Sequence, residues 1–525
     1  MKDFGARPWS ATSQPRGLDR ILGTATGVLM LTAALRLPAL RYPGPIDDEK
    51  VYAVVANELL AGGLPYRDAI ERKPPLLFWI YEAVFALAGK VDFTLLHFVG
   101  LLWVLATMAG LYVGARSCFS RETGLAAAML YGIYMAAAEY KNLAVNGELL
   151  MNLPLVWAWA LVLQRQTRLR PLALFFAGAL LTAAALIKQP AGAAAIALGL
   201  YMLLPSYRRV HKLTLTHQLA QVALVVFGAL LALLTVLFVL AQQGILREAI
   251  YWSIGDHDIP HGVGDPIFWK RAWGGGGWFF ASCAPLTLLV ALALRAGFGA
   301  RRWFADTRSE LHGITLLLAC STLGASASGR FYTHYFLQLL PAMAWLGAVA
   351  LVHLRQQPES YAARLCSANS IQIGIFLTAL AFLSLDARAL GRDLDDRATA
   401  SYVETHSSKT DRIFVWGQTS GFYLRAQRRP ASRYIAVFPL TGYIFGSPLG
   451  RDPHYDTSHR IVPGAWDQLA SDLARHPPLF IIDSDSTSAN PKYDPFAYPM
   501  LAALLREHYE RVFASHDGIA YRRVR

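Results

Sequence analysis

Long apolar segments recur along the first three quarters of the chain, separated by short polar connections. An apolar run of about twenty residues is long enough to cross the hydrocarbon core of a bilayer as a helix. The pattern predicts about eleven such spans, near residues 21–40, 93–115, 122–140, 148–164, 171–187, 189–204, 218–241, 273–294, 311–328, 333–354 and 369–388. We therefore expect a polytopic α-helical membrane protein.

One apolar segment does not fit this series. Residues 73–89 are long enough to be considered as a further span, but a crossing there would reverse every later loop. Their polar and amphipathic side chains suit a helix at the membrane surface better; these are Lys73, Trp79, Tyr81 and Glu82. We predict amphipathic helices on the outer surface over residues 47–89.

The pattern changes after about Leu390. Short β-branched and aromatic runs bounded by turn residues replace the long apolar segments. They predict strands near 412–417, 479–483 and 518–523, with helices near 466–475 and 497–508. We expect a transmembrane domain over residues 1–389, with a first outer loop at 41–92, followed by an α/β domain over 390–525.

Composition and charge support this division. The chain is 54% hydrophobic and 16% charged, with a mean hydropathy of +0.32, which is typical of a multi-span membrane protein. The net charge of +13 does not require a nucleic-acid partner, and none is expected. With the N-terminus inside, most Lys and Arg of the short loops fall on the inner side, as the positive-inside rule demands. The C-terminal domain then lies outside.

The first outer loop carries the most informative polar residues. Asp47, Asp48 and Glu49 are consecutive carboxylates, and Lys73 follows beside a pair of prolines. The acids could cap a helix that starts near Val51. One of them could also act as a general base toward an acceptor hydroxyl. The two interpretations are compatible, and Asp48 is our candidate for the base.

Other polar residues fall on the same side of the membrane. Glu148 opens the fourth span, where it would line a cavity or lie at the interface. Lys188 separates two apolar runs, where it would bind substrate or extend to the interface. Arg330, His334 and Tyr335 join the ninth and tenth spans. These donors beside an apolar groove suit a phosphate that carries a lipid tail, although tyrosines also serve as interfacial anchors.

The loop over residues 243–271 has two interpretations. Its acidic and histidine side chains suggest a metal site, but their spacing matches no compact ligand motif; they are Asp256, His257, Asp258, His261 and Asp265. A cover over the substrate, with His257 contacting it, is the preferred interpretation, and no metal site is predicted. The four cysteines are scattered, which predicts no disulfide framework. No phosphate-binding glycine motif is present, so an activated donor would have to arrive as a membrane lipid.

The first loop also resembles a known family. The residues that carry the resemblance are Asp48-Glu49 with Tyr52, the run over 58–68, and Lys73-Pro74-Pro75-Leu76-Leu77. They resemble the opening of polyprenyl-phosphate-dependent glycosyltransferases of the GT-C fold. These are the protein O-mannosyltransferase-like family, which includes bacterial aminoarabinose and galacturonic acid lipid A transferases.

The resemblance implies a reaction mechanism and a cellular location for the protein. It implies inverting transfer of a sugar from a lipid phosphate on the periplasmic side of the inner membrane. Asp48, with Glu49 beside it, matches the catalytic acid of the family's first loop, and Lys73 matches a lysine that contacts phosphate. Lys188, and Arg330 with His334, fall where further phosphate contacts are expected. The family commonly has an aspartate at the mouth of the fourth span, where this chain has Glu148.

Taken together, the sequence predicts a membrane glycosyltransferase that requires no cofactor or metal. Its partners would be a polyprenyl-phosphate sugar, membrane lipids, and a glycolipid, glycan or protein acceptor. The main alternative is a transporter or flippase for a lipid-linked substrate, since charged residues inside a membrane also line transport pathways. A structural protein of the envelope is a third interpretation, but it would leave the lysines unexplained.

Overall fold

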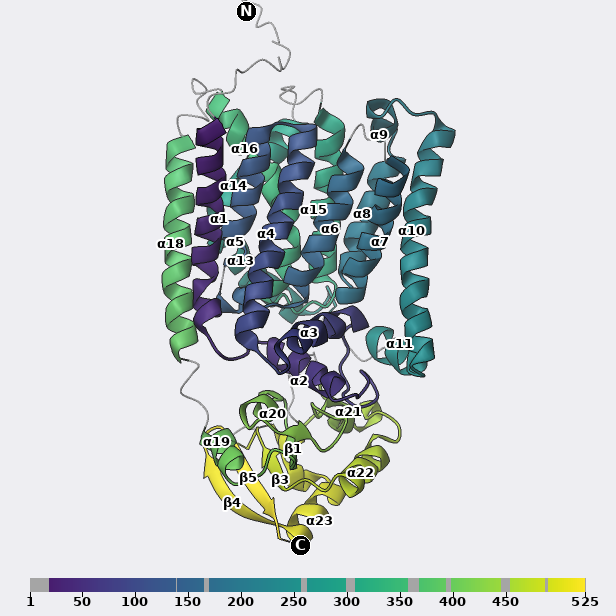
Figure 1. The fold of residues 1–525 in the computed structure, drawn as a ribbon, viewed down its shortest axis with the longest axis vertical. Helices are drawn as coiled ribbons and strands as arrows, with labels where there is room; N and C mark the ends of the chain where they lie inside the picture. The colour runs from purple at the N-terminus through teal and green to yellow at the C-terminus, as the bar shows by residue number, and fades with distance from the viewer. Residues whose placement is uncertain are drawn as a thin grey trace, which may run out of the picture.

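Long helices lie side by side in a bundle, and a smaller unit of strands and short helices lies at one end of it (Figure 1). In this computed structural model, helix α1 (Leu18–Arg41) and α18 (Ala368–Arg392) form one edge of the bundle, and α10 (Leu215–Gln242) forms the other. The structure describes residues 18–137, 139–164, 170–255, 262–298, 307–356, 368–392, 398–444, 454–486 and 490–524.

Each segment predicted to span the membrane contains helix. The remaining helices of the bundle are α4 (Phe93–Cys118), α5 (Arg121–Tyr134), α6 (Gly147–Leu163), α7 (Arg170–Ile187), α8 (Ala191–Leu203), α13 (Gly277–Ser282), α14 (Ala284–Phe298), α15 (Arg308–Ser326) and α16 (Leu340–Gln356). Within the described ranges, four helical segments are long and apolar enough to cross a bilayer, namely Phe93–Cys118, Arg170–Ile187, Leu215–Gln242 and Thr333–Gln356. These apolar helices make the chain a membrane protein, and the count of about eleven crossings stays a prediction.

The predicted span over residues 273–294 is bent. Segments Pro266–Ser282 and Ala284–Ala296 meet at 91°, and together they would make a fifth crossing. Pro285 lies in the first turn of α14, a position that favours a new helix because proline lacks the amide hydrogen. The apolar pattern alone shows no break at this point.

Glycines let two outer helices touch. A Cβ at Gly178 of α7 would come within 1.8 Å of the Val225 carbonyl oxygen of α10. A Cβ at Gly228 would come within 1.9 Å of the Phe175 carbonyl oxygen. Such close backbone approach is how helices associate in lipid, where burial of apolar surface gives little driving force. Helix α10 also exposes large apolar side chains, as a helix that faces lipid does; examples are Phe227, Leu234 and Phe238.

The two helices of the first loop lie between the bundle and the strands (Figure 1). They are α2 (Glu49–Leu60) and α3 (Pro75–Ala88), so the predicted helices are present at the end of the bundle. Helix α3 begins with proline at its first position and ends at Gly89, whose φ of 66° closes the helix. The hydroxyl of Tyr81 on α3 donates to the Val145 carbonyl at 2.6 Å, which fixes α3 against the start of α6.

The C-terminal strands form one mixed sheet. They are β1 (Arg412–Trp416), β2 (Arg429–Pro430), β3 (Phe480–Asp483), β4 (Tyr509–Ser515) and β5 (Gly518–Arg523), in the order β2-β1-β3-β5-β4. Strand β1 is parallel to β2 and β3, whereas β5 is antiparallel to β3 and β4. Helices α22 (Ala465–Arg475) and α23 (Pro499–His508) are present as predicted. Strand β4 was not predicted, because it follows α23 directly and is largely exposed.

The C-terminal unit contacts the first loop through polar and aromatic groups. The Arg429 guanidinium donates from Nε and Nη2 to the two carboxylate oxygens of Glu58 on α2, at 2.9 and 2.6 Å. The Ile70 amide donates to the Arg433 carbonyl at 2.9 Å. The Arg72 guanidinium lies 4.9 Å from the centre of the Phe438 ring. These contacts place the sheet directly over the first loop, and the boundary near residue 390 stays a prediction.

Candidate active site

The turn that precedes α2 presents two carboxylates to the same space. Asp47 adopts a left-handed conformation with φ of 51°, which aspartate tolerates better than most residues. Asp48 occupies the N-cap position of α2, yet its side chain accepts no capping hydrogen bond from the described first turn. Its carboxylate instead accepts a hydrogen bond from the Tyr52 hydroxyl at 3.3 Å. The capping role therefore does not account for the Asp48 carboxylate.

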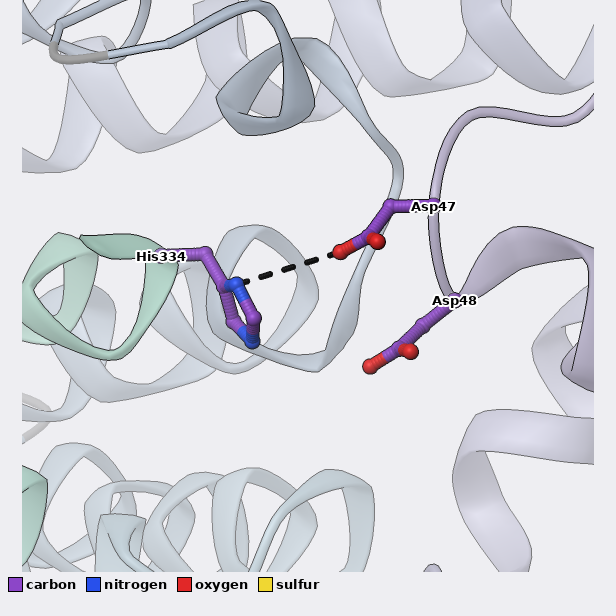
Figure 2. A group of neighbouring side chains, drawn as sticks. All are labelled: Asp47, Asp48 and His334. Carbon is purple, nitrogen blue, oxygen red and sulfur yellow. Dashed lines mark ion pairs between the residues drawn. The ribbon is translucent and has the colours of Figure 1, made fainter. Parts of the chain in front are cut away.

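Figure 2 shows Asp47, Asp48 and His334 facing one another. The His334 Nδ1 atom lies 3.9 Å from Asp47 Oδ2, and the Lys141 ammonium lies 3.5 Å from Asp47 Oδ1. One ligand atom from each of the three side chains lies within 4.8 Å of the others, so this group could hold a metal ion. The Lys141 ammonium already offsets part of the carboxylate charge.

The pKa values of the two aspartates shift in opposite directions. Burial, together with the neighbouring Asp48 carboxylate, raises the pKa of Asp47. Burial also opposes ionisation of Asp48, but the positive charges of His334, Lys73, Lys188 and Lys50 outweigh it and lower the pKa of Asp48 below its usual value. Asp48 is therefore the more readily ionised residue of the pair, and it lies where positive charges from several segments converge.

Lys73 and Lys188, two of the cations that act on Asp48, line a cavity of about 220 Å³. Asp47, Asp48 and His334 are not among the described residues that line it. Five of the residues predicted from the sequence line it, namely Lys73, Glu148, Lys188, Arg330 and Tyr335. The further polar and aromatic residues of its wall are Arg72, Gln189, Trp252, Ser253 and Gln338. Four basic side chains on one cavity wall make a site for an anion such as a phosphate.

Lys188 is held in place by the break between α7 and α8. It is the first residue after α7, where Pro190 prevents the helix from continuing. Its ammonium forms an ion pair with the Glu148 carboxylate and lies 4.7 Å from the centre of the Tyr335 ring. Both charged side chains are almost fully buried, at 7% and 2% exposed. Gly147 is needed here, because a Cβ would come within 2.9 Å of Lys188 Cδ.

Lys73 reaches the cavity from the turn that precedes α3. Its carbonyl accepts a hydrogen bond from the Tyr66 hydroxyl at 2.7 Å, and Tyr66 itself has a left-handed backbone with φ of 66°. Burial and the nearby charge of Lys188 lower the pKa of Lys73. The ammonium is thus desolvated and close to a second cation, which strengthens its attraction for an incoming anion.

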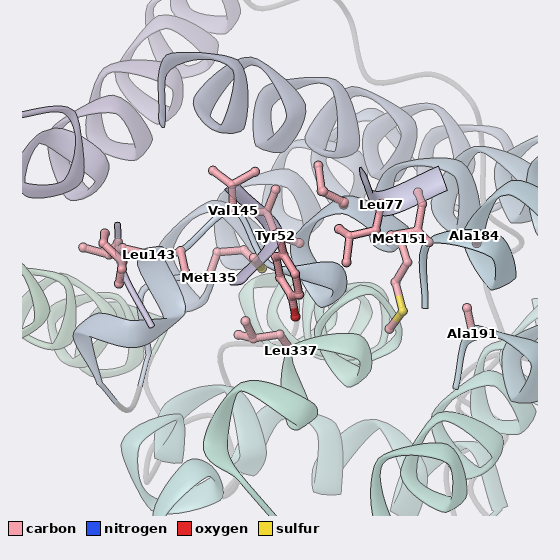
Figure 3. Close-up of a cluster of buried hydrophobic side chains, with 14 of the residues drawn as sticks. Tyr52, Leu77, Met135, Leu143, Val145, Met151, Ala184, Ala191 and Leu337 are labelled. Atoms are coloured by element: carbon pink, nitrogen blue, oxygen red, sulfur yellow. The ribbon is translucent and has the colours of Figure 1, made fainter. Parts of the chain in front are cut away.

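An apolar cluster adjoins the cavity. Figure 3 shows side chains from the first loop and from several helices of the bundle packed together, including Tyr52, Leu77, Met151 and Leu337. Of these, Met151 also lines the cavity. Cations next to an apolar cluster suit a substrate with one charged end and one lipid end.

Two predicted residues are not part of this arrangement. Glu49 is fully buried. Its carboxylate accepts hydrogen bonds from the Ile46 and Val145 amides, and its catalytic role stays a prediction. His257 lies outside the described residues.

Some lining residues had no role assigned to them from the sequence. Arg72 precedes Lys73 directly, so the pair of adjacent cations was an available signal. Gln189 follows Lys188 in the same helix break, whereas Gln338 has no local signal because it lies inside an apolar run. The distance along the chain between these residues explains why the sequence did not group them.

Comparisons with known proteins agree with the expected resemblance. The sequence model of the dolichyl-phosphate-mannose-protein mannosyltransferase family matches residues 72–239. The structure is similar to ArnT from Cupriavidus metallidurans, solved with bound undecaprenyl phosphate, with a TM-score of 0.60 and 15% identity over 96% of this chain and 97% of that one. It is also similar to the Archaeoglobus fulgidus oligosaccharyltransferase solved with a tethered acceptor peptide, with a TM-score of 0.53 and 11% identity over 97% and 74% of the chains.

A complex of that archaeal enzyme, AglB, with an inhibitory peptide and a dolichol-phosphate gives a TM-score of 0.51 at 10% identity, over 96% of this chain and 74% of that one. Among curated proteins, none matches the sequence significantly. The chain therefore has the fold of the GT-C glycosyltransferases, and its central segment carries the sequence pattern of a mannosyltransferase family that uses a lipid-phosphate sugar.

The buried ion pair between Glu148 and Lys188 gives a test of the site's construction. Replacing Lys188 by Met should lower the free energy of unfolding by about 3 kcal/mol, because Glu148 is left charged without its partner. Adding Glu148→Gln should recover most of that loss, because no buried charge then remains. Chemical unfolding in detergent measures both variants. A double variant as unstable as Lys188→Met alone would contradict the pairing.

Proposed function

We propose that this protein transfers a sugar from a polyprenyl-phosphate donor to an acceptor hydroxyl, with inversion at the anomeric carbon and Asp48 as the general base. The observation that supports it is the convergence of an ionised Asp48 with Lys73, Lys188 and His334, next to a cavity that Arg330 also lines. The fold of the relatives supports the reaction class. Because a single displacement on the anomeric carbon inverts it, one base and one anion site are sufficient.

The reaction proceeds in one step in this proposal. The acceptor oxygen attacks the anomeric carbon and gives its proton to the Asp48 carboxylate. The bond from that carbon to the phosphate oxygen breaks, and the lipid phosphate leaves with the bonding electrons. Lys73, Lys188 and Arg330 stabilise the negative charge that grows on the phosphate, and preorganised cations in a water-poor site are well suited to this.

The donor's lipid would lie along the apolar side of the bundle. Cations line the cavity, and Met151 belongs both to its lining and to the apolar cluster of Figure 3. The ring of Trp252, which also lines the cavity, gives a flat apolar surface beside the polar groups. Cations next to an apolar cluster match a sugar and phosphate attached to a polyprenyl chain.

The proposal also places the protein in the cell. We propose that it lies in the inner membrane, with α9 (Pro205–Val210) and its Arg208 and Arg209 on the cytoplasmic side. Helix α9 lies at the end of the bundle opposite to α2 and α3 (Figure 1). The first loop, the cavity and the C-terminal sheet then face the periplasm. The acceptor would be lipid A, another envelope glycan or a protein.

Replacing Asp48 by Asn should lower the rate of sugar transfer by about 10²- to 10⁴-fold, the usual contribution of a general base. Donor binding and thermal stability should change little, since the amide has the same shape. Purified protein is incubated with radiolabelled polyprenyl-phosphate sugars and envelope lipid extract, and label on the acceptor is counted. Glu82→Gln, in the same loop but outside the cavity lining, is the matched control. Near-normal transfer by the Asp48 variant would remove Asp48 from the role of base.

The pH dependence should report Asp48 and Lys73. Asp48 acts as a carboxylate, and because its pKa lies below the usual 3.8, transfer should fall on the acid side only below that pH. Lys73 acts as an ammonium, and because its pKa lies below the usual 10.5, transfer should fall as pH rises toward a value below 10.5. Lys73→Arg should move this alkaline limb of kcat/KM upward, because guanidinium stays charged. An alkaline limb that does not move would exclude Lys73 as its source.

Transfer should not need a divalent metal. The Asp47, Asp48 and His334 group could hold one, but Lys141 and His334 already pair with Asp47, and basic residues line the cavity. We expect an unchanged rate after dialysis against EDTA. Loss of transfer that Mg²⁺ or Mn²⁺ restores would instead assign these carboxylates to a metal.

A further inference from the structure

A buried pair of ionisable side chains, Glu49 and His97, lies under the first loop. The carboxylate oxygen Oε2 of Glu49 lies 3.0 Å from Nε2 of His97, and both side chains are 0% exposed. Oε2 also accepts a hydrogen bond from the Ile46 amide at 2.7 Å. Oε1 accepts one from the Val145 amide at 2.5 Å. Both oxygens of Glu49 are thus occupied.

The geometry around His97 requires a proton between the two side chains. Nδ1 of His97 lies 2.7 Å from the Ala39 carbonyl oxygen, which can only accept, so Nδ1 carries a hydrogen. Nε2 faces a carboxylate oxygen that already accepts from a backbone amide. A single hydrogen therefore lies between Nε2 of His97 and Oε2 of Glu49 and binds the two side chains together.

This pair joins segments that are far apart in the chain. Ala39 belongs to the end of α1, His97 to α4, Ile46 to the turn before α2, and Val145 to the connection before α6. Arg36 also holds α1 against the connection before α6, because its Nη2 donates to the Leu143 carbonyl at 2.6 Å. Leu143 and Val145 are both visible in the buried cluster of Figure 3.

The hydrogen bond between the Val145 amide and Glu49 connects two residues that adjoin the candidate active site. Glu49 follows Asp48 directly, and Val145 lies three residues before Glu148, the partner of Lys188. The bond from the Val145 amide to Glu49 therefore sets how far the carboxylate of Asp48 lies from the cation that Glu148 holds. A shift of about 1 Å in such a geometry can cost 10²-fold in rate.

Stability alone gives little reason to keep such a pair. Burying two ionisable side chains is expensive, and a well-packed apolar pair of similar volume is often as stable or more so. What an apolar pair could not do is accept two backbone amides and fix two loops at once. This argues for a role in positioning.

We propose that Glu49 and His97 are positioning residues, which hold Asp48 in register with the Glu148–Lys188 pair. The inference rests on the proposed function for its effect on rate. Its structural half, the ordering of residues 46–49 against residues 143–145, stands independently of that function. His97 acts through Glu49 and touches no substrate.

Two variants of similar size test the two hydrogen bonds of His97 one at a time. In His97→Gln the amide nitrogen falls near the place of Nε2, so the bond to Glu49 is kept. In His97→Asn it falls near the place of Nδ1, so only the bond to Ala39 is kept. Thr107→Ala is the stability control, because Thr107 is also fully buried on α4 but bonds to the Trp103 carbonyl of that helix and to Tyr131 of α5 rather than to the two loops.

The readouts are kcat and donor KM for sugar transfer, and hydrogen exchange of peptides that cover residues 44–50 and 143–148. We expect His97→Asn to lower kcat about 10²-fold, with an unchanged donor KM and faster exchange in both peptides. His97→Gln should stay within about tenfold of the original kcat and keep slow exchange. Thr107→Ala should change neither readout, whatever its melting temperature.

Equal behaviour of His97→Asn and His97→Gln, in both rate and exchange, would overturn the inference. Faster exchange in His97→Asn, with no sugar transfer by any form of the protein, would support the positioning of the two loops and contradict the proposed function instead. A donor KM that rises together with the fall in kcat would assign His97 to donor binding, and would also overturn the inference.

Discussion

The candidate active site depends on opposite charges that stabilise one another at one end of an apolar helix bundle. Lys188, Glu148 and Asp48 are each poorly solvated, and each would be costly if it stood alone. They are tolerated because opposite charges from four separate segments meet there, with Lys188 paired to Glu148 and Asp48 placed among cations. The same compensation leaves basic side chains on the cavity wall for a phosphate.

The rest of the fold serves to bring those segments together. The break between α7 and α8 brings Lys188 inward, and Pro74 and Pro75 at the start of α3 direct Lys73. The short 3₁₀ helix over Thr333–Leu339 presents His334 and Tyr335. The C-terminal sheet covers the first loop from the other side, through Arg429 and Glu58. The candidate site residues therefore lie on short segments between or at the ends of the helices, and the long helices hold these segments at fixed positions.

Much of this could be predicted because charge in an apolar context is conspicuous. Lys73, Glu148, Lys188 and Arg330 stand out in the sequence beside long apolar runs, and the structure brings them to one cavity. The helices and most strands follow from the periodicity of apolar residues. The bend before Pro285 was not predicted, because composition on both sides of it is equally apolar.

The role of Glu49 was missed for a different reason. Its partners His97 and Val145 are 48 and 96 residues away, and no local pattern shows that they meet. Next to Asp48 it was read as a second catalytic acid, yet one step along a helix turns a side chain by about 100°. That rotation turns the Glu49 carboxylate into the core, where it accepts hydrogen bonds from two backbone amides. Three-dimensional proximity, and not adjacency in the sequence, decides the partners of each of the two acids.

The most direct measurement is an experimental structure of the protein with bound polyprenyl phosphate. The account predicts density for the phosphate in contact with Lys73, Lys188 and Arg330, with the lipid along the apolar wall and the Asp48 carboxylate about one sugar ring away. A phosphate bound at the opposite end of the bundle, or one separated from Asp48 by a packed wall of side chains, would contradict it.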